Sequence, residues 1–374
     1  MVWGVPGIPG TLSVHQPVAA AGVQDPTPTR ALRRSGPGGG PRRSRGYIHP
    51  STIQQKITDT PVPTYTARDT PFMRPPIATV LTPLLLSLVA CDTTEVDRPA
   101  FDGAAALEYA RQQLDFGPRI PGSEGHARMG DWLVQQMRER ADTVVEQTWT
   151  HVTVAGDSLP MRNVLARFHP DSRRRILYVA HWDTRPISDK ADAARRSIPV
   201  PGANDGASGV ALLMAVADQL QAMPPNVGVD LLFVDGEDYG DFDRMEDVLI
   251  GSRWFAQNLP EADYQPMIGV VWDMIGDADL VIHQEGYSLR GAPEVVERVW
   301  RVAGELGHSS TFRSSSQGGV VDDHIPLLEV GLRVINVIDM NYPPHHTPDD
   351  TMDRISAASL QIVGEVAMGV IRGF

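Results

Sequence analysis

The sequence predicts a single α/β domain built on a doubly wound, mostly parallel mixed sheet with helices on both faces. Four runs are apolar at almost every position, as strands buried on both faces of a parallel sheet are; they cover residues 175–180, 229–234, 268–272 and 330–338. Segments with helical spacing separate these runs. Regular alternation of strand and helix is the pattern of such a sheet.

The other expected elements follow in chain order. A first helix is expected at 103–114 and an amphipathic one at 124–139, where Trp132, Leu133 and Met137 share one face. Two further strands are expected near 144–149 and 163–168. Helices are predicted between and after the apolar runs, at 209–223, 251–257, 293–306 and 355–371.

Residues 1–72 are not expected to fold. They are rich in Pro, Gly, Arg and Thr, as between Ser35 and Arg43, and they show no sustained period. Such a composition cannot bury enough apolar surface to offset the entropy lost on ordering. We expect this segment to be either a disordered arm or a mispredicted extension of the chain.

Residues 73–91 have the outline of a secretory signal peptide. Met73 and Arg74 lead into the apolar run 77–90, which ends at Cys91. The run is shorter than the ~20 residues that a membrane span needs. Leu88 to Cys91 resembles the lipobox of bacterial lipoproteins. We expect Met73 to be the true start and Cys91 to carry a lipid anchor, with the protein exported to the periplasm or cell envelope of a bacterium. A linker at 92–100 and a folded domain at 101–374 would follow.

Charge and cysteine content exclude several classes of function. Residues 1–72 carry a net charge of +5, and the remaining residues carry 25 basic and 43 acidic groups, a net charge of −18. The arginines are not interleaved with aromatic residues, so no nucleic-acid partner is expected. A single cysteine excludes a disulfide framework and an all-thiolate metal site.

Histidines and acids stand where the apolar runs end or a helix begins. There are six such places: His181 with Asp183, Asp205, Glu237 with Asp238, Asp273, Asp322 to His324, and His345 with His346. Ligands of an open α/β sheet bind at the carboxyl ends of its strands. Imidazole and carboxylate groups converging there are what a zinc site needs. The pattern therefore predicts a metalloenzyme.

Taken singly, each place has an ordinary alternative. Asp183 is placed to hold the far nitrogen of His181, but such a pair is also common on surfaces. Asp205 could cap the following helix. Glu237 and Asp238 point in different directions, so one can bind metal while the other acts as a general base; adjacent acids are equally often solvated.

The remaining places also have ordinary alternatives. Asp273 follows an apolar run and is the hardest to explain otherwise. His345 and His346 lie in a proline-rich loop, where a lone histidine is more often a bystander than a ligand. Asp322 could simply belong to a helix start. Only the combination of all six places is specific.

In their order and spacing, these motifs resemble the zinc-dependent exopeptidase superfamily, which includes di-zinc aminopeptidases and glutaminyl cyclases. The resemblance runs from Phe116 to the C-terminus and implies the phosphorylase/hydrolase-like form of the predicted sheet. Details favour the cyclase branch: the twelve residues between Asp238 and Gly251, the Pro-Gly-Ser at 121–123, and the Asp-Asp-His-Ile-Pro at 322–326.

The resemblance also implies roles for individual residues. It assigns the zinc ligands to Asp205, Asp238 and His346, and the general acid/base to Glu237. In di-zinc relatives His181 and Asp273 would hold a second metal bridged by Asp205. In cyclases, which use one zinc, Asp273 and Asp322 would instead form an acid network with Glu237.

Two positions depart from the cyclase pattern. Asp238 stands where a Glu is usual. His345 stands where animal cyclases have a Trp that lines the substrate pocket, to which Tyr342 is also assigned. The resemblance thus implies glutaminyl-peptide cyclotransferase activity on peptide or protein N-termini. A zinc aminopeptidase is the alternative, and a non-catalytic binding domain is less favoured. The oligomeric state stays open.

Overall fold

The computed structural model describes residues 100–374. The predictions for residues 1–72 and 73–91 and for the linker that follows lie outside the described residues. Within residues 100–374, no helix is long and apolar enough to cross a membrane.

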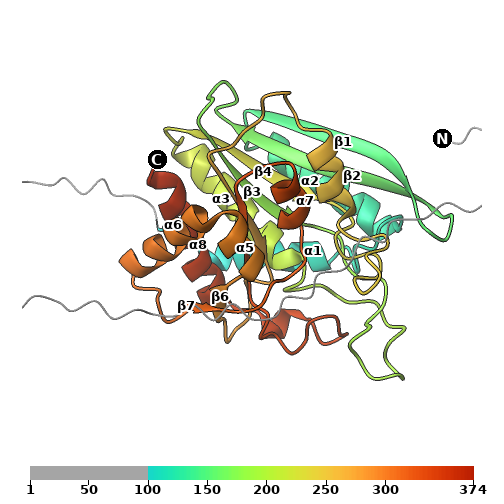
Figure 1. The fold of residues 1–374 in the computed structure, drawn as a ribbon. Coiled ribbons are helices and arrows are strands. Elements are labelled where there is room, and N and C mark those ends of the chain that lie inside the picture. The colour runs from blue at the N-terminus through green and yellow to red at the C-terminus, as the bar shows by residue number, and fades with distance from the viewer. Residues whose placement is uncertain (1–99) are drawn as a thin grey trace, which may run out of the picture. The chain divides into compact units, whose positions relative to one another are not determined.

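A six-stranded mixed sheet forms the centre of the domain (Figure 1). Its strands lie in the order β1 (Thr143–Val152), β2 (Ser158–Phe168), β4 (Gly228–Val234), β3 (Arg175–His181), β5 (Ile268–Asp273) and β8 (Val334–Ile338). The four strands from β4 to β8 are parallel, and β1 and β2 are antiparallel to their neighbours. The mostly parallel sheet is confirmed. The short strands β6 (Ile282–Gln284) and β7 (Phe312–Ser316) form a separate parallel pair.

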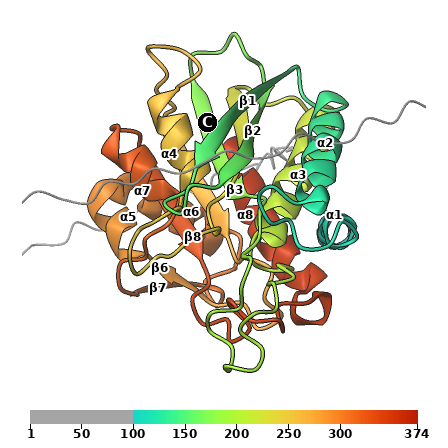
Figure 2. The same ribbon diagram turned by 90° about the vertical axis from the view of Figure 1, so that its right-hand side faces the viewer.

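Helices cover both faces of the sheet (Figure 2). The helices that pack in the larger core are α1 (Gly103–Leu114), α2 (Glu124–Arg138), α3 (Ala207–Ala222), α6 (Pro293–Glu305) and α8 (Ala357–Arg372). The opposite face is covered by α4 (Ile250–Gln257) and α7 (His324–Glu329). The short helix α5 (Gly286–Gly291) and a 3-10 turn, Met352–Arg354, complete the described elements.

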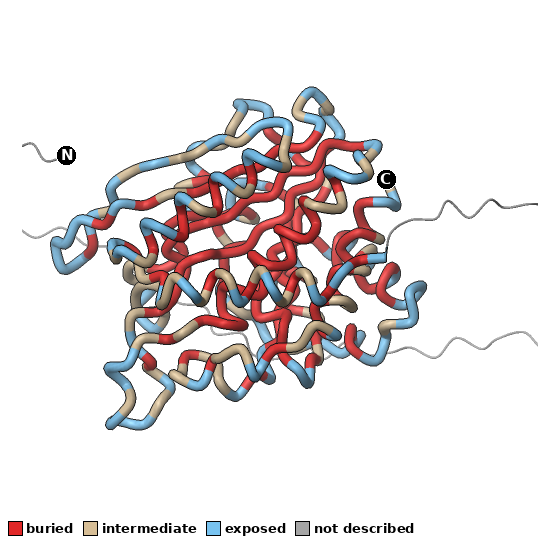
Figure 3. Tube along the Cα trace, turned by 180° about the vertical axis from the view of Figure 1, so that it is seen from behind, coloured by how far each residue is buried: buried red, intermediate tan, exposed pale blue. Residues whose placement is uncertain are grey.

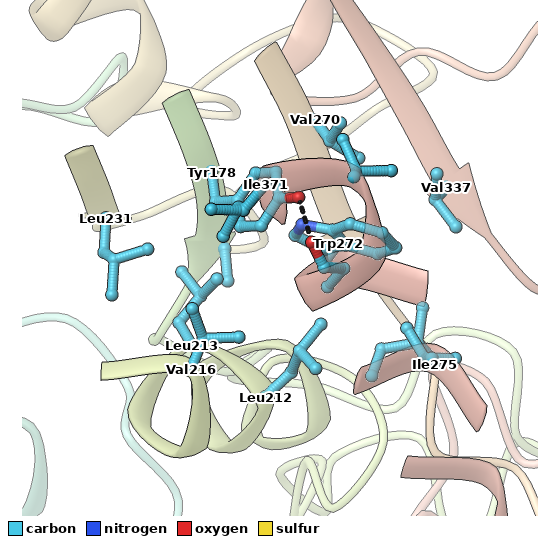
Figure 4. Close-up of a cluster of buried hydrophobic side chains, with 14 of the residues drawn as sticks. Tyr178, Leu212, Leu213, Val216, Leu231, Val270, Trp272, Ile275, Val337 and Ile371 are labelled. Atoms are coloured by element: carbon cyan, nitrogen blue, oxygen red, sulfur yellow. Dashed lines mark hydrogen bonds between the residues drawn. The ribbon is translucent and has the colours of Figure 1, made fainter. Parts of the chain in front are cut away.

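Side chains of the central strands alternate between the two cores. On β3, Ile176 and Tyr178 point into the larger core and Leu177 and Val179 into the smaller one, and Figure 3 shows the strands buried along their length. In the larger core Trp272 packs edge-on against Tyr178, whose hydroxyl donates to the carbonyl oxygen of Ala367 at 2.7 Å (Figure 4). The sheet is therefore packed on both faces and supports the side chains at its edge.

Most predicted elements have the expected bounds to within about two residues. The exceptions are at strand ends: β1 ends at Val152 rather than 149, β2 begins at Ser158 rather than 163, and β8 begins at Val334 rather than 330. Residues 330–333 instead form a turn after α7, in which Gly331 has a φ of 87°. The elements β6, β7 and α5 were not predicted, because they are too short to show a period.

Helix α3 approaches β5 so closely that Gly209 is required. A Cβ at this position would collide with the carbonyl oxygen of Trp272, the residue before Asp273. We expect Gly209→Ala to lower the free energy of unfolding by ~1–3 kcal/mol, as overpacking does. Gly304→Ala is the control, because its Cβ would meet only Ser309 Oγ at 3.5 Å. Urea titration of both variants tests this; equal midpoints would contradict it.

Candidate metal centre

The predicted site residues converge at one edge of the sheet. Since β3, β4 and β5 are parallel, their carboxyl ends bring together His181, the Glu237–Asp238 pair and Asp273. His346 comes from the loop after β8, and Asp205 from the corner before α3. The convergence that the sequence predicted is present in the structure.

Asp205 does not cap helix α3. The N-cap is Gly206, which has a φ of 86°, and no side chain bonds the first turn. The buried carboxylate of Asp350 instead accepts the backbone N–H groups of Asn204 and Asp205, at 2.8 and 3.1 Å. The corner is thus held by a neighbouring loop, and the Asp205 carboxylate is left for another role. The capping alternative is wrong.

The two carboxylate oxygens of Asp205 face two groups of ligand-type atoms. Oδ1 lies 3.1 Å from His181 Nε2, which in turn lies 3.3 Å from Asp273 Oδ1. Oδ2 lies 3.6 Å from His346 Nε2 and 3.7 Å from His345 Nε2, and it accepts no hydrogen bond. Asp205 therefore lies between two clusters, as a bridging ligand would.

Asp183 holds the turn that carries Glu237 and Asp238. Its two oxygens accept the N–H groups of Glu237 and Asp238, at 3.0 and 3.1 Å. It lies 3.5 Å from His181 Nδ1, which is beyond a good hydrogen bond. The expected contact with His181 is thus loose, and the main role of Asp183 is to fix the two acids.

Glu237 and Asp238 point apart, as the sequence predicted. Asp238 Oδ1 lies 3.2 Å from His346 Nε2. Glu237 Oε2 lies 3.9 Å from His181 Nδ1, and Glu237 lines the cavity described below. Burial raises the pKa of Glu237 well above its usual range, against the opposing charge of His181. A raised pKa suits a carboxyl group that must both accept and return a proton.

His346 has a left-handed backbone, with a φ of 56°. Met274, directly after Asp273, has a φ of 45°. Such conformations are unfavourable for residues with a Cβ and cluster at functional sites.

Although burial lowers the pKa of His346, the nearby acids Asp238 and Asp189 raise it to about 9. The site thus carries an excess of negative charge that a cation would balance.

The two residues assigned to the substrate pocket differ in position. His345 lies in the cavity wall, and its ring packs edge-on against that of His346 at 3.9 Å between centroids. Lys190 Nζ lies 2.8 Å from its Nδ1. Tyr342 is buried away from the cavity wall, and its hydroxyl donates to Asp350 at 2.6 Å. Tyr342 therefore supports the corner before α3 instead of lining the pocket.

Asp322 lies in the cavity wall just before helix α7, which begins at His324. Its Oδ2 accepts from the Asn336 side chain at 2.5 Å, and its Oδ1 accepts the N–H of Asp323. Burial raises the pKa of Asp322, and burial also raises that of Asp273, to about 7. Among the described residues, no hydrogen bond joins Asp273 or Asp322 to Glu237, so the predicted hydrogen-bonded network is not formed; besides burial, the charge of Asp322 raises the pKa of Glu237.

A cavity of about 750 Å³ opens over the cluster. Six predicted site residues line it: Asp205, Glu237, Asp273, Asp322, His345 and His346. The rest of the lining is mixed: it includes apolar side chains, among them Ile187, Phe242, Val320 and Met340, and charged ones, among them Arg185, Asp189, Lys190 and Asp241. This volume is in the range of small-molecule and peptide-end sites.

The donor set fits zinc. Tetrahedral zinc with ligands at 2.0–2.2 Å places neighbouring donor atoms about 3.3 Å apart, and the contacts of His346 with Asp238 and of His181 with Asp205 and Asp273 are of this length. In two sets of three residues the donor atoms all lie within 4.8 Å of one another: Asp205 with His345 and His346, and His181 with Asp205 and Asp273. The predicted ligand Asp238 belongs to neither set and is linked to Asp205 through His346, which lies 3.2 Å from Asp238 and 3.6 Å from Asp205. Imidazole with carboxylate is a usual zinc environment.

The sequence reasoning missed four residues that position the site. Besides Asp350, they are Arg119, whose buried guanidinium donates to the carbonyl oxygens of Pro201 and Gly202 beside Asp205, and the pair Arg185 and Asp189. All lie in loops without a period. Arg185 and Asp189 are four residues apart, whereas the partners of Arg119 and the backbone groups held by Asp350 are distant in the sequence. No sequence signal marked these residues.

Fold and site together define the class of α/β exopeptidase-like metalloenzymes. Residues 163–371 match the model of peptidase family M28, and the chain belongs to this family. The similar proteins are enzymes of two kinds, glutaminyl cyclases and aminopeptidases.

Three relatives illustrate the range. Aminopeptidase YwaD of Bacillus subtilis is 28% identical over 72% of this chain, which spans only 57% of the YwaD length. The crystal structure of Bacteroides thetaiotaomicron glutaminyl cyclase bound to N-acetylhistamine is 33% identical, with a TM-score of 0.72 over 74% of this chain and 100% of that one. A Zn-dependent exopeptidase from Parabacteroides distasonis is 31% identical, with a TM-score of 0.70 over the same shares.

Proposed function

We propose that this chain is a zinc-dependent glutaminyl-peptide cyclotransferase, which converts an N-terminal glutamine of a peptide or protein to pyroglutamate and releases ammonia. Glu237, a buried carboxyl group with a raised pKa in the cavity wall beside the cluster around Asp205, supports proton transfer in either candidate reaction. The observation that favours the cyclase is the similarity to the Bacteroides thetaiotaomicron glutaminyl cyclase along its whole length, whereas the chain spans only 57% of YwaD.

Asp205, Asp238 and His346 would hold the zinc, which when bound would act as a Lewis acid on the carbonyl group of the substrate. The nitrogen of the neutral α-amine bonds to the side-chain amide carbon, and Glu237 takes a proton from that nitrogen. The carbon–nitrogen bond of the amide then breaks as Glu237 gives this proton to the departing NH2 group, which leaves as ammonia. Besides burial, the charge of Asp322 favours the protonated form of Glu237, and the cyclase resemblance assigns Asp273 to the same group of acids.

Zinc aminopeptidase activity is the second candidate. The buried set of His181, Asp205 and Asp273 favours it, because this set offers a second metal position. In that reaction Glu237 would deprotonate the attacking water, and the first peptide bond would break. YwaD, an aminopeptidase, is a relative on this side of the family.

The first test is a product assay. The domain from Asp92 onward, loaded with zinc, is mixed with a peptide that begins with Gln, and the products are analysed by mass spectrometry. We expect loss of ammonia from an intact peptide, faster than the spontaneous reaction. Release of free glutamine would instead assign the chain to the aminopeptidases, and no product of either kind would favour a binding domain.

The proposal extends to location and partners. We propose an exported bacterial protein whose residues 73–91 are a signal peptide and whose Cys91 is lipidated, with peptide N-termini as substrates and no nucleic-acid partner. Metabolic labelling with a fatty acid, compared between the wild type and Cys91→Ala, tests the anchor. Equal labelling of both would contradict it.

A further inference from the structure

A loop between β3 and α3 contacts two of the proposed zinc ligands through charged side chains. Arg185 Nη1 donates to Asp238 Oδ1 at 2.7 Å and to the Asp238 carbonyl oxygen at 3.1 Å. Arg185 also donates through Nε and Nη2 to the two oxygens of Asp189, at 2.9 and 3.1 Å. Asp189 Oδ1 lies 3.1 Å from His346 Nδ1.

These contacts close into a ring, since His346 Nε2 lies 3.2 Å from Asp238 Oδ1. The loop itself is anchored: the N–H of Val200 donates to the Arg185 carbonyl oxygen at 3.1 Å, and the N–H of Lys190 to the His346 carbonyl oxygen at 3.3 Å. The Arg185 side chain is 3% exposed. A buried guanidinium with two carboxylate partners has a fixed position.

We infer that Arg185 and Asp189 form a clamp that positions Asp238 and His346 for the metal, and that the clamp sets the zinc affinity of the site. This inference rests on the zinc site of the proposed function. Both residues lie in the cavity wall, but neither belongs to the two sets of donor residues, and we assign both a positioning role.

The physical reason lies in the two kinds of contact. The planar fork of arginine fixes both the direction and the rotamer of a carboxylate in a way that lysine cannot. Asp189 lies 3.1 Å from His346 Nδ1, although this contact does not have hydrogen-bond geometry. A carboxylate at this nitrogen favours the proton there, which leaves the lone pair of Nε2 for a metal. One guanidinium thus orients one ligand directly and the other through Asp189.

The positive charge of Arg185 is expected to change zinc affinity in the opposite direction to its positioning of the ligands. A positive charge this close to Asp238 repels a cation and so weakens its binding. If charge were its only effect, replacing Arg185 with a neutral residue would tighten zinc binding. If the clamp positions the ligands, replacement weakens binding. The sign of the change therefore separates the two explanations.

The test measures the zinc dissociation constant by competition with a chromophoric chelator. Partners that orient metal ligands are usually worth 10–100-fold in affinity. We expect Arg185→Lys, which keeps the charge and loses the fork, to bind zinc ~10-fold more weakly, and Arg185→Gln to bind 10–100-fold more weakly. Arg195→Lys is the matched control, because Arg195 lies on the same loop as Arg185 and makes an exposed ion pair with Asp349. It should bind zinc as the wild type does.

Asp189→Asn provides a second variant in case the arginine variants fold poorly. We expect ~10-fold weaker zinc binding, against no change for Asp349→Asn, which removes the same charge from an exposed site. The zinc-induced rise in melting temperature is measured for each variant against its own apo form, so that a loss of stability alone does not count.

Zinc affinity of Arg185→Lys within twofold of the wild type, or tighter binding by Arg185→Gln, would overturn the clamp. These outcomes leave the proposed function intact if the wild type binds zinc and turns over its substrate. Failure of the wild type to bind zinc would instead overturn the proposed function, and the clamp with it.

Discussion

Glu237→Gln is expected to lower the turnover number by ~10²–10⁴-fold, the usual contribution of a general acid/base. The amide has nearly the same shape as the carboxyl group but cannot take up the proton of the attacking group. Because both candidate reactions require this transfer, the loss is expected for cyclisation and for peptide hydrolysis alike. Steady-state kinetics with the substrate found in the product assay give the measurement.

The same variant should keep its fold and its zinc. Glu237 is held through its backbone N–H by Asp183, and its carbonyl oxygen accepts the N–H of Leu249 at 2.9 Å, so the substitution leaves these bonds in place. Zinc content and melting temperature should match the wild type to within error. Glu329→Gln, an exposed position on α7, is the control. A fully active Glu237→Gln enzyme would remove Glu237 from the mechanism.

The sheet was predictable because its strands are buried on both faces. A run such as 229–234 has no polar side that could be confused with a surface helix, and the acids after it mark its end. The start of β2 was not predictable in this way, because Ser158, Pro160 and Arg162 alternate with Leu159 and Met161, and the pairing with β1 decides the bound. This first part of β2 pairs only with β1, since β4 pairs with β2 from Val164 onward, and a strand formed by such pairing depends on its neighbour more than on composition.

The candidate site was predictable to the extent that its residues follow strand ends. His181, Asp205, Glu237 and Asp273 lie together because parallel strands end at one edge. Their supports were not predictable. Asp350 bonds to the backbone of Asp205, 145 positions away. No period or local motif in the sequence indicates a contact of that kind. The contact between Tyr342 and Asp350 was missed for the same reason, and Tyr342 was wrongly assigned to the pocket.

The second large effect is expected from Asp205→Asn, which should abolish the stabilisation of the protein by zinc. Zinc at 100 times its dissociation constant stabilises a folded protein by ~2.7 kcal/mol, which for a domain of this size corresponds to a rise of ~5–10 °C in melting temperature. Asp205 faces both donor sets, so loss of its charge weakens either metal position. Calorimetry with and without zinc gives the rise for each protein.

The apo form of Asp205→Asn should be less stable than the apo wild type: burial raises the pKa of Asp205, but the facing His181 and His346 lower it below its usual range, so the carboxylate stabilises the fold. The backbone N–H of residue 205 still bonds to Asp350. Burial raises the pKa of Asp350 most and the charge of Asp205 raises it further, and the variant removes that charge. Relief of the repulsion between Asp205 and Asp350 offsets only part of this loss of stability, because His181 and His346 are left without the carboxylate that faces them. Each zinc-induced rise is therefore measured against the variant's own apo form: a residue needed only for packing would lower the apo melting temperature and leave the rise unchanged, whereas loss of a ligand abolishes the rise. Asp349→Asn, exposed and close in the chain to His346, should change neither quantity.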